Sequence, residues 1–232
     1  MLKKDLSLRN PLSLLGNQTD DIIPAGKCGA ILARAGVGKT AMIVQIALHS
    51  LLRGKNVLHI SLNEPVDKVT LWYREVFNLL ADEYNVTRMD QLWESLFPHR
   101  FIMTFKVGGF SVPKLQERLS DIVEQQIFVP TMMIIDGLPF DDSAVSQLRE
   151  LTGLAQKHNI HIWLTVTTHR HEAPGPDGLP VQMTGVSDFF EFIVQLRPEG
   201  DQIHIDALKG GPSKDAHTLL LDPSTMLVKD IG

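Results

Sequence analysis

The order of local patterns over residues 28–53 limits the possible folds of this chain more than any other feature of the sequence. Residues 28–33 form a short apolar run, which is typical of a buried strand. A glycine-bearing loop follows at once. From Lys39 to about Arg53 the apolar residues recur at helical spacing, and Gly54 supplies a natural helix stop. A strand, a tight loop and a helix in this order predict an α/β unit.

The loop between this strand and helix reads ARAGVGKT over residues 33–40. It matches the phosphate-binding pattern G-x-x-x-x-G-K-[ST] at Gly38, Lys39 and Thr40, with Ala33 at the place of the first glycine. Successive backbone N–H groups and a helix N-terminus attract anions, Lys39 supplies a charge for the β- and γ-phosphates, and the Thr40 hydroxyl is placed for Mg²⁺. We therefore predict that ATP with Mg²⁺ is held by Ala35, Gly36, Val37, Gly38, Lys39, Thr40 and Ala41. The alternative is a glycine-rich turn that binds nothing.

Two carboxylates follow apolar strands and are candidate partners of this loop. The apolar run 131–136 ends in Asp136, and a buried carboxylate is costly without a nearby cation. We expect Asp136 to support Mg²⁺ together with Thr40. Glu64 follows the strand at 56–62, where a carboxylate could orient or deprotonate an attacking water. The alternatives are a turn or cap role for Asp136 and a helix-start role for Glu64.

The rest of the chain alternates between strand and helix patterns and then changes character. Such alternation predicts a twisted, mainly parallel sheet with helices on both faces, and the closely spaced strands at the end predict an antiparallel extension. We expect a lead-in over 1–27 and one domain over 28–232. The expected strands are 28–33, 56–62, 101–105, 131–136, 160–168, 191–197, 202–208 and 217–228, and the expected helices are 39–53, 66–83, 112–127 and 143–157.

Composition places the chain among ordinary globular proteins, with 44% hydrophobic and 21% charged residues among 232. The formal net charge of −5 gives no global sign of a nucleic-acid partner. Cys28 is the single cysteine, so an internal disulfide is excluded. There is no signal-peptide pattern at the start and no apolar run long enough for a membrane span, so we expect a cytoplasmic protein.

Four stretches in order resemble one known family. They are AGVGKT at 35–40, SLNEP at 61–65, IID at 134–136 and TVTTH at 165–169. Together they are similar to the RecA-like ATPases, closest to the branch that holds the circadian-clock ATPase KaiC, the recombinase RadA and the replicative helicase DnaB. The resemblance covers residues 20–228. It implies a P-loop NTPase fold, ATP bound between neighbouring subunits, and assembly into hexamer-like rings or filaments.

The resemblance also implies roles for individual residues. The catalytic glutamate, often one of a Glu-Glu pair, falls on Asn63-Glu64, so only the second acid is kept. The sensor of the γ-phosphate falls on Thr168 or His169. A Lys-x-Arg finger that reaches a neighbour's γ-phosphate falls on Lys209, with Gly211 in place of the arginine. Since such a finger contributes orders of magnitude to the rate, slow hydrolysis is expected.

The loop after residue 168 carries two further hypotheses. His169, Arg170, His171 and Glu172 are not spaced like a zinc site, so a metal is not favoured there. In the family the following loop can contact DNA, but residues 172–183 contain no lysine. Because phosphate contacts dominate nucleic-acid affinity, DNA is a disfavoured partner.

These inferences predict an ATPase of this family that works as an oligomer and regulates a protein partner. Glu64, Lys39 and Lys209 are its expected catalytic residues. The alternatives are a DNA-dependent ATPase, such as a helicase or recombination factor, and an ATP-binding scaffold that does not hydrolyse. A small-molecule kinase would need an arginine-rich lid, and the sequence shows no such cluster.

Overall fold

One mixed sheet forms the centre of this computed structural model, which describes residues 11–15, 21–105, 108–169, 172, 174–175, 178–211 and 218–231. Its strand order is β3-β2-β4-β5-β1-β6-β7-β8-β9. The strands are β1 (Cys28–Ala33), β2 (Val57–Ser61), β3 (Arg100–Thr104), β4 (Met132–Asp136), β5 (His161–Thr167), β6 (Phe190–Glu199), β7 (Gln202–Lys209), β8 (Leu219–Leu221) and β9 (Val228–Asp230). The α-helices are α2 (Lys39–Leu52), α3 (Val66–Glu83), α4 (Met89–Glu94), α5 (Val112–Glu124) and α6 (Ala144–His158), and the 3-10 helices are η1 (Pro11–Leu15), η2 (Phe97–His99), η3 (Val181–Met183) and η4 (Ser187–Phe189).

The strands from β3 to β6 in this order are parallel, and the last three are antiparallel. All residues of β1 are buried, and so are the first four of β4. Strands covered on both faces need continuous apolar runs, which is why these two strands were recognisable in the sequence. The predicted α/β fold, with a mainly parallel sheet and an antiparallel C-terminal extension, is confirmed.

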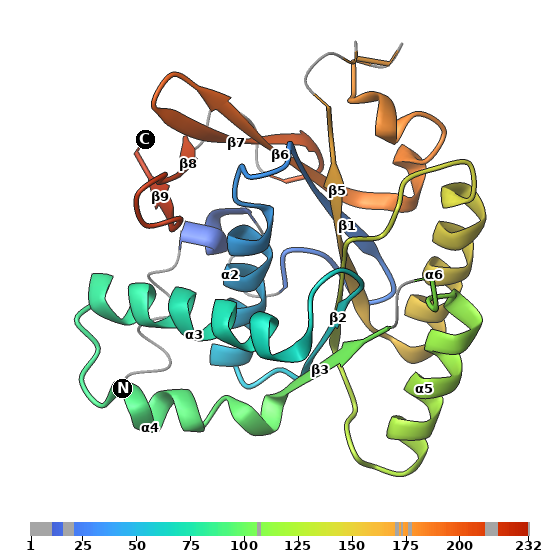
Figure 1. The fold of residues 1–232 in the computed structure, drawn as a ribbon, viewed down its shortest axis with the longest axis horizontal. Coiled ribbons are helices and arrows are strands. Elements are labelled where there is room, and N and C mark those ends of the chain that lie inside the picture. The colour runs from blue at the N-terminus through green and yellow to red at the C-terminus, as the bar shows by residue number, and fades with distance from the viewer. Residues whose placement is uncertain are drawn as a thin grey trace.

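Helices cover both faces of the sheet (Figure 1). Helices α2, α3 and α4 pack on one face, where Met42 and Phe77 belong to one buried core. Helices α5 and α6 pack on the other face, where Leu115 and Leu148 belong to a second core. The described part of the segment before β1 joins the first core through the buried Leu12, Leu15 and Ile23. None of the helices among the described residues is long and apolar enough to cross a membrane.

Three local predictions were wrong or incomplete. The single strand expected at 217–228 is two short strands, because the Asp222 side chain accepts hydrogen bonds from the turn amides of Ser224 and Thr225 and reverses the chain. Helix α5 ends at Glu124, three residues early, where Gln126 takes a left-handed conformation with φ 56°. Helix α4 was not predicted, because only six residues offer too little periodicity.

Candidate nucleotide site

The loop between β1 and α2 has the backbone shape that an anion site needs. Gly36 and Gly38 have φ of 76° and 103°, in the left-handed region that glycine enters without steric cost. The first hydrogen bond of α2 runs from Met42 N–H to the Gly38 carbonyl. The amides of Lys39, Thr40 and Ala41 therefore have no acceptor within the helix. Ala35 and Gly36 are exposed, Val37, Gly38, Lys39 and Thr40 are half-buried, and Ala41 is buried.

The Lys39 ammonium folds back over this loop. It donates hydrogen bonds to the carbonyls of Ala33, at 3.0 Å, and Arg34, at 3.1 Å. Burial lowers the pKa of Lys39, and the charge of Asp136 acts in the opposite direction. The amine is thus a half-buried cation fixed at the start of this loop, residues 34–38, which we call the phosphate loop after its predicted role.

Asp136 is the last residue of β4, and one of its two carboxylate oxygens accepts a hydrogen bond from a neighbouring strand. Its Oδ1 accepts a hydrogen bond from the Thr165 hydroxyl at 2.6 Å. Burial raises the pKa of Asp136, the Thr165 hydrogen bond and the Lys39 charge lower it, and the Glu64 charge raises it further. These effects place Lys39 and Glu64 within electrostatic reach of Asp136.

Glu64 lies just beyond β2, and its carboxylate has a partner of its own. The Glu64 backbone N–H donates to the Ser61 hydroxyl at 3.0 Å, which fixes the turn after the strand. Its Oε1 accepts a 2.8 Å hydrogen bond from Lys68 in the first turn of α3. The neighbouring Asn63 packs its amide against Gly137, where an added Cβ would lie 2.2 Å from Asn63 Nδ2.

The two expected sensor residues lie at the end of β5 in different surroundings. Thr168 is buried, and its N–H donates to the Ala33 carbonyl at 3.0 Å, which ties the end of β5 to the phosphate loop. His169 is exposed. Both line a cavity of about 400 Å³ together with Arg34, Gln195 and others. The neighbouring Arg170 and His171 lie outside the described residues.

Lys209 lies apart from this cluster. Its ammonium donates to the Ser187 carbonyl at 2.9 Å, and Ser187 belongs to η4, just before β6 begins. Because β6 runs parallel to β1, the beginning of β6 and the end of β1 lie at opposite edges of the sheet. Lys209 therefore does not reach the phosphate loop of its own chain.

The donor set fits Mg²⁺ bound together with phosphates. Mg²⁺ uses one or two carboxylates, substrate phosphates and water. Asp136 offers a carboxylate whose Oδ2 accepts no hydrogen bond from the described residues. A cation bound there would offset the energetic cost of burying the charge of this carboxylate. Thr40 offers a hydroxyl. No group of three or more His, Cys, Asp or Glu residues within the described ranges could hold a metal alone.

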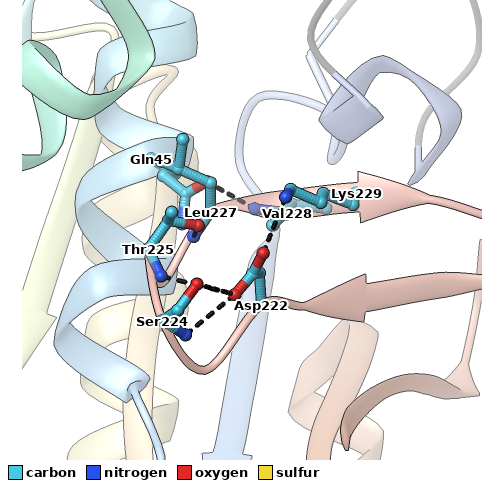
Figure 2. Close-up of polar contacts among 7 residues, drawn as sticks. All are labelled: Gln45, Asp222, Ser224, Thr225, Leu227, Val228 and Lys229. Carbon is cyan, nitrogen blue, oxygen red and sulfur yellow. Dashed lines mark hydrogen bonds and ion pairs between the residues drawn. The ribbon is translucent and has the colours of Figure 1, made fainter. Parts of the chain in front are cut away.

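Sequence reasoning missed two buried polar residues that organise this region. Thr165 holds Asp136, and Gln45 bonds α2 to the turn between β8 and β9 (Figure 2). Each is visible in the sequence as a polar residue between two apolar neighbours, and buried polar side chains need partners. The partners themselves were not visible, since they lie on other elements.

Comparison with models of known protein families gives no match for this chain, and comparison with curated proteins gives none either.

Proposed function

We propose that this protein is an ATP-binding P-loop ATPase, RecA-like and KaiC-like, that hydrolyses ATP slowly with Mg²⁺. The observation that carries the proposal is the convergence of three strand ends at the start of α2. Lys39 follows β1, Glu64 follows β2 and Asp136 ends β4, and parallel strands present their carboxyl ends to ligands at one edge. Two glycines with left-handed backbone and three helix amides complete an anion site there.

Each residue has a role in this proposal. The loop amides and Lys39 bind the phosphates, and Thr40 and Asp136 support Mg²⁺, which neutralises charge on the transferred phosphoryl group. Glu64 activates the attacking water, which it orients or deprotonates. Thr168 and His169 sense the γ-phosphate. Lys209 serves a neighbouring copy, because it lies across the sheet from its own loop.

Three features support slow turnover. Asn63 replaces the first acid of the pair, so one carboxylate remains near the water. That carboxylate, Glu64, is occupied by Lys68 at 2.8 Å. Gly211 stands where the family carries the finger arginine, and its hypothetical Cβ would meet Phe192 at 2.5 Å, so this position holds no side chain. ATP-dependent assembly that regulates a protein partner suits such an enzyme.

The test is ATP hydrolysis by the purified protein, with and without single-stranded DNA, beside the Lys39→Ala variant. Lys114→Ala is the matched control, because that lysine also donates to a backbone carbonyl, that of Gly109, but lies on α5. We expect turnover that is lost with Lys39→Ala, kept with Lys114→Ala and indifferent to DNA. Strong stimulation by DNA would instead indicate a nucleic-acid motor.

Glu64→Gln separates an ATPase from a scaffold. We expect this variant to bind ATP like the wild type and to lose turnover, because the amide cannot accept the proton of the water. Unchanged turnover would remove Glu64 from the mechanism. ATP binding without any turnover in the wild type would leave a nucleotide-controlled scaffold. Light scattering with and without ATP and Mg²⁺ measures the expected assembly.

A further inference from the structure

Thr165 lies beside Asp136 on the neighbouring strand. The pairing of β4 and β5 ends with Ile135 opposite Leu164, and Asp136 and Thr165 are the next residues of the two strands. Thr165 is 3% exposed and lies within an apolar strand. Its hydroxyl oxygen is 2.6 Å from Asp136 Oδ1 and 3.1 Å from Gly137 N.

These two contacts fix the direction of the hydroxyl hydrogen. A threonine hydroxyl has one hydrogen and two lone pairs. The Gly137 N–H can only donate, so it takes a lone pair of Thr165 Oγ1. The single hydrogen is then directed at Asp136 Oδ1, which accepts it. This arrangement favours the ionised carboxylate and fixes the rotation of its plane.

As a consequence, the two carboxylate oxygens of Asp136 have different surroundings. Oδ1 is held by Thr165, and among the described residues no hydrogen bond reaches Oδ2. Lys39 acts on Asp136 through its charge, while its ammonium hydrogen-bonds to the Ala33 and Arg34 carbonyls. The free oxygen is thereby presented in one orientation at the edge of the sheet where the phosphate loop lies.

We infer that Thr165 is a positioning residue, which fixes the Asp136 carboxylate so that Oδ2 is directed at the Mg²⁺ of a bound nucleoside triphosphate. The inference rests on the proposed function, because Mg²⁺ enters with the nucleotide. Partners that orient a ligating carboxylate commonly contribute 10–100-fold to metal affinity. Thr165 acts through Asp136, whose Oδ1 it holds.

The test titrates Mg²⁺ against binding of a fluorescent ATP analogue to the wild type, Thr165→Val and Thr165→Ser. Valine keeps the shape and removes the donor, and serine keeps the donor. We expect Thr165→Val to raise the Mg²⁺ concentration for half-maximal binding by about 10–100-fold. Thr165→Ser should have the same half-maximal Mg²⁺ concentration as the wild type. Thr152→Val, which removes a threonine hydroxyl on α6, is the matched control and should leave it unchanged.

A second readout needs no metal. A carbon-13 NMR titration of Asp136 in the metal-free protein should show a higher pKa in Thr165→Val than in the wild type, since the hydroxyl that stabilises the charged form is gone. If valine prevents folding, Thr165→Cys, a poorer donor, takes its place.

The outcomes separate this inference from the proposed function. Equal Mg²⁺ dependence and equal Asp136 titration in the wild type and Thr165→Val would overturn the inference. If the wild type bound no ATP analogue with Mg²⁺, the proposed function would fail. The Mg²⁺ part of the inference would fail with it, even if the Asp136 titration still shifted.

Discussion

The Gln45 side chain of α2 accepts a hydrogen bond from the backbone N–H of Val228 at 2.9 Å, across 183 positions of the chain. Its amide also donates to the carbonyls of Met226, at 2.7 Å, and Ala41, at 3.2 Å. Gln45 is 1% exposed. The helix that begins at the phosphate loop is thus joined to the last two strands, whose turn is closed by Asp222 (Figure 2).

Replacing Gln45 by methionine should destabilise the protein. The thioether fills similar space but leaves the buried Val228 N–H and the half-buried Met226 carbonyl without their Gln45 partner. Each unpaired group costs about 1–3 kcal/mol, so we expect a loss of about 2–4 kcal/mol in the free energy of unfolding. Urea denaturation measures it. Gln91→Met, at an exposed position of α4, should change stability by less than about 0.5 kcal/mol. Equal effects of the two variants would contradict the role of Gln45.

The two glycines of the phosphate loop should respond differently to alanine. Both have positive φ, so each substitution is strained. At Gly38 the added Cβ would also lie 2.6 Å from Leu221 Cδ2, whereas at Gly36 it meets nothing within 4 Å. We expect Gly36→Ala to cost about 1 kcal/mol and Gly38→Ala about 2–3 kcal/mol. In thermal unfolding, Leu221→Ala should soften only the Gly38→Ala defect. A larger defect at Gly36 would show that the Leu221 contact does not matter.

We predict that position 137 needs glycine for two reasons, which are its positive φ and its close contact with the Asn63 side chain. It has φ 92°, and an added Cβ would lie 2.2 Å from Asn63 Nδ2. Gly137→Ala should therefore displace Asn63 and cost about 1–3 kcal/mol. A double-mutant cycle with Asn63→Ala should recover the steric part and leave the backbone part. Strict additivity of the two substitutions in chemical denaturation would rule out the contact.

Stability should fall in mild acid because three histidines, His49, His59 and His161, are buried uncharged. Burial lowers the pKa of His49 to about 4 and that of His59 to about 3, against 6.5 when unfolded. At a pH between the folded and the unfolded pKa of a histidine, the unfolded chain binds more protons than the folded protein. This contribution to stability is therefore complete above pH 6.5 and is lost as the pH falls. For His49 the loss by pH 4 is about 3 kcal/mol.

The measurement is the free energy of unfolding against pH from 7 to 4 for the wild type and His49→Leu. The variant loses the proton-linked part that belongs to His49, so its curve should be flatter, whatever its stability at pH 7. Parallel curves would show that His49 titrates normally in the folded protein. His204→Leu is the control, since that residue lies on β7 near the Glu199 carboxylate and is half-buried.

Local physics explains why much of the fold was readable in the sequence. The buried strands β1 and β4 are recognisable as unbroken apolar runs. Helix α3 is recognisable because its apolar residues recur at helical spacing up to about Glu83. The strand–loop–helix order around Gly38 also depends only on neighbouring residues. The sequence alone therefore determined the succession of most elements, the shape of the phosphate loop, and the positions of Asp136 at the end of one strand and Glu64 beyond the end of another.

Strand order and register decided the rest. Asp136 lies near Lys39 because the sheet order is β4-β5-β1, and it meets Thr165 because β4 and β5 pair in one particular register. Lys209 is turned away from its own loop because β7 is antiparallel to β6. The partners of Gln45, Met226 and Val228, lie at a turn within residues 217–228, which the sequence predicted to be one continuous strand. Such contacts join residues far apart in the chain, and hydrophobic periodicity carries no information about them.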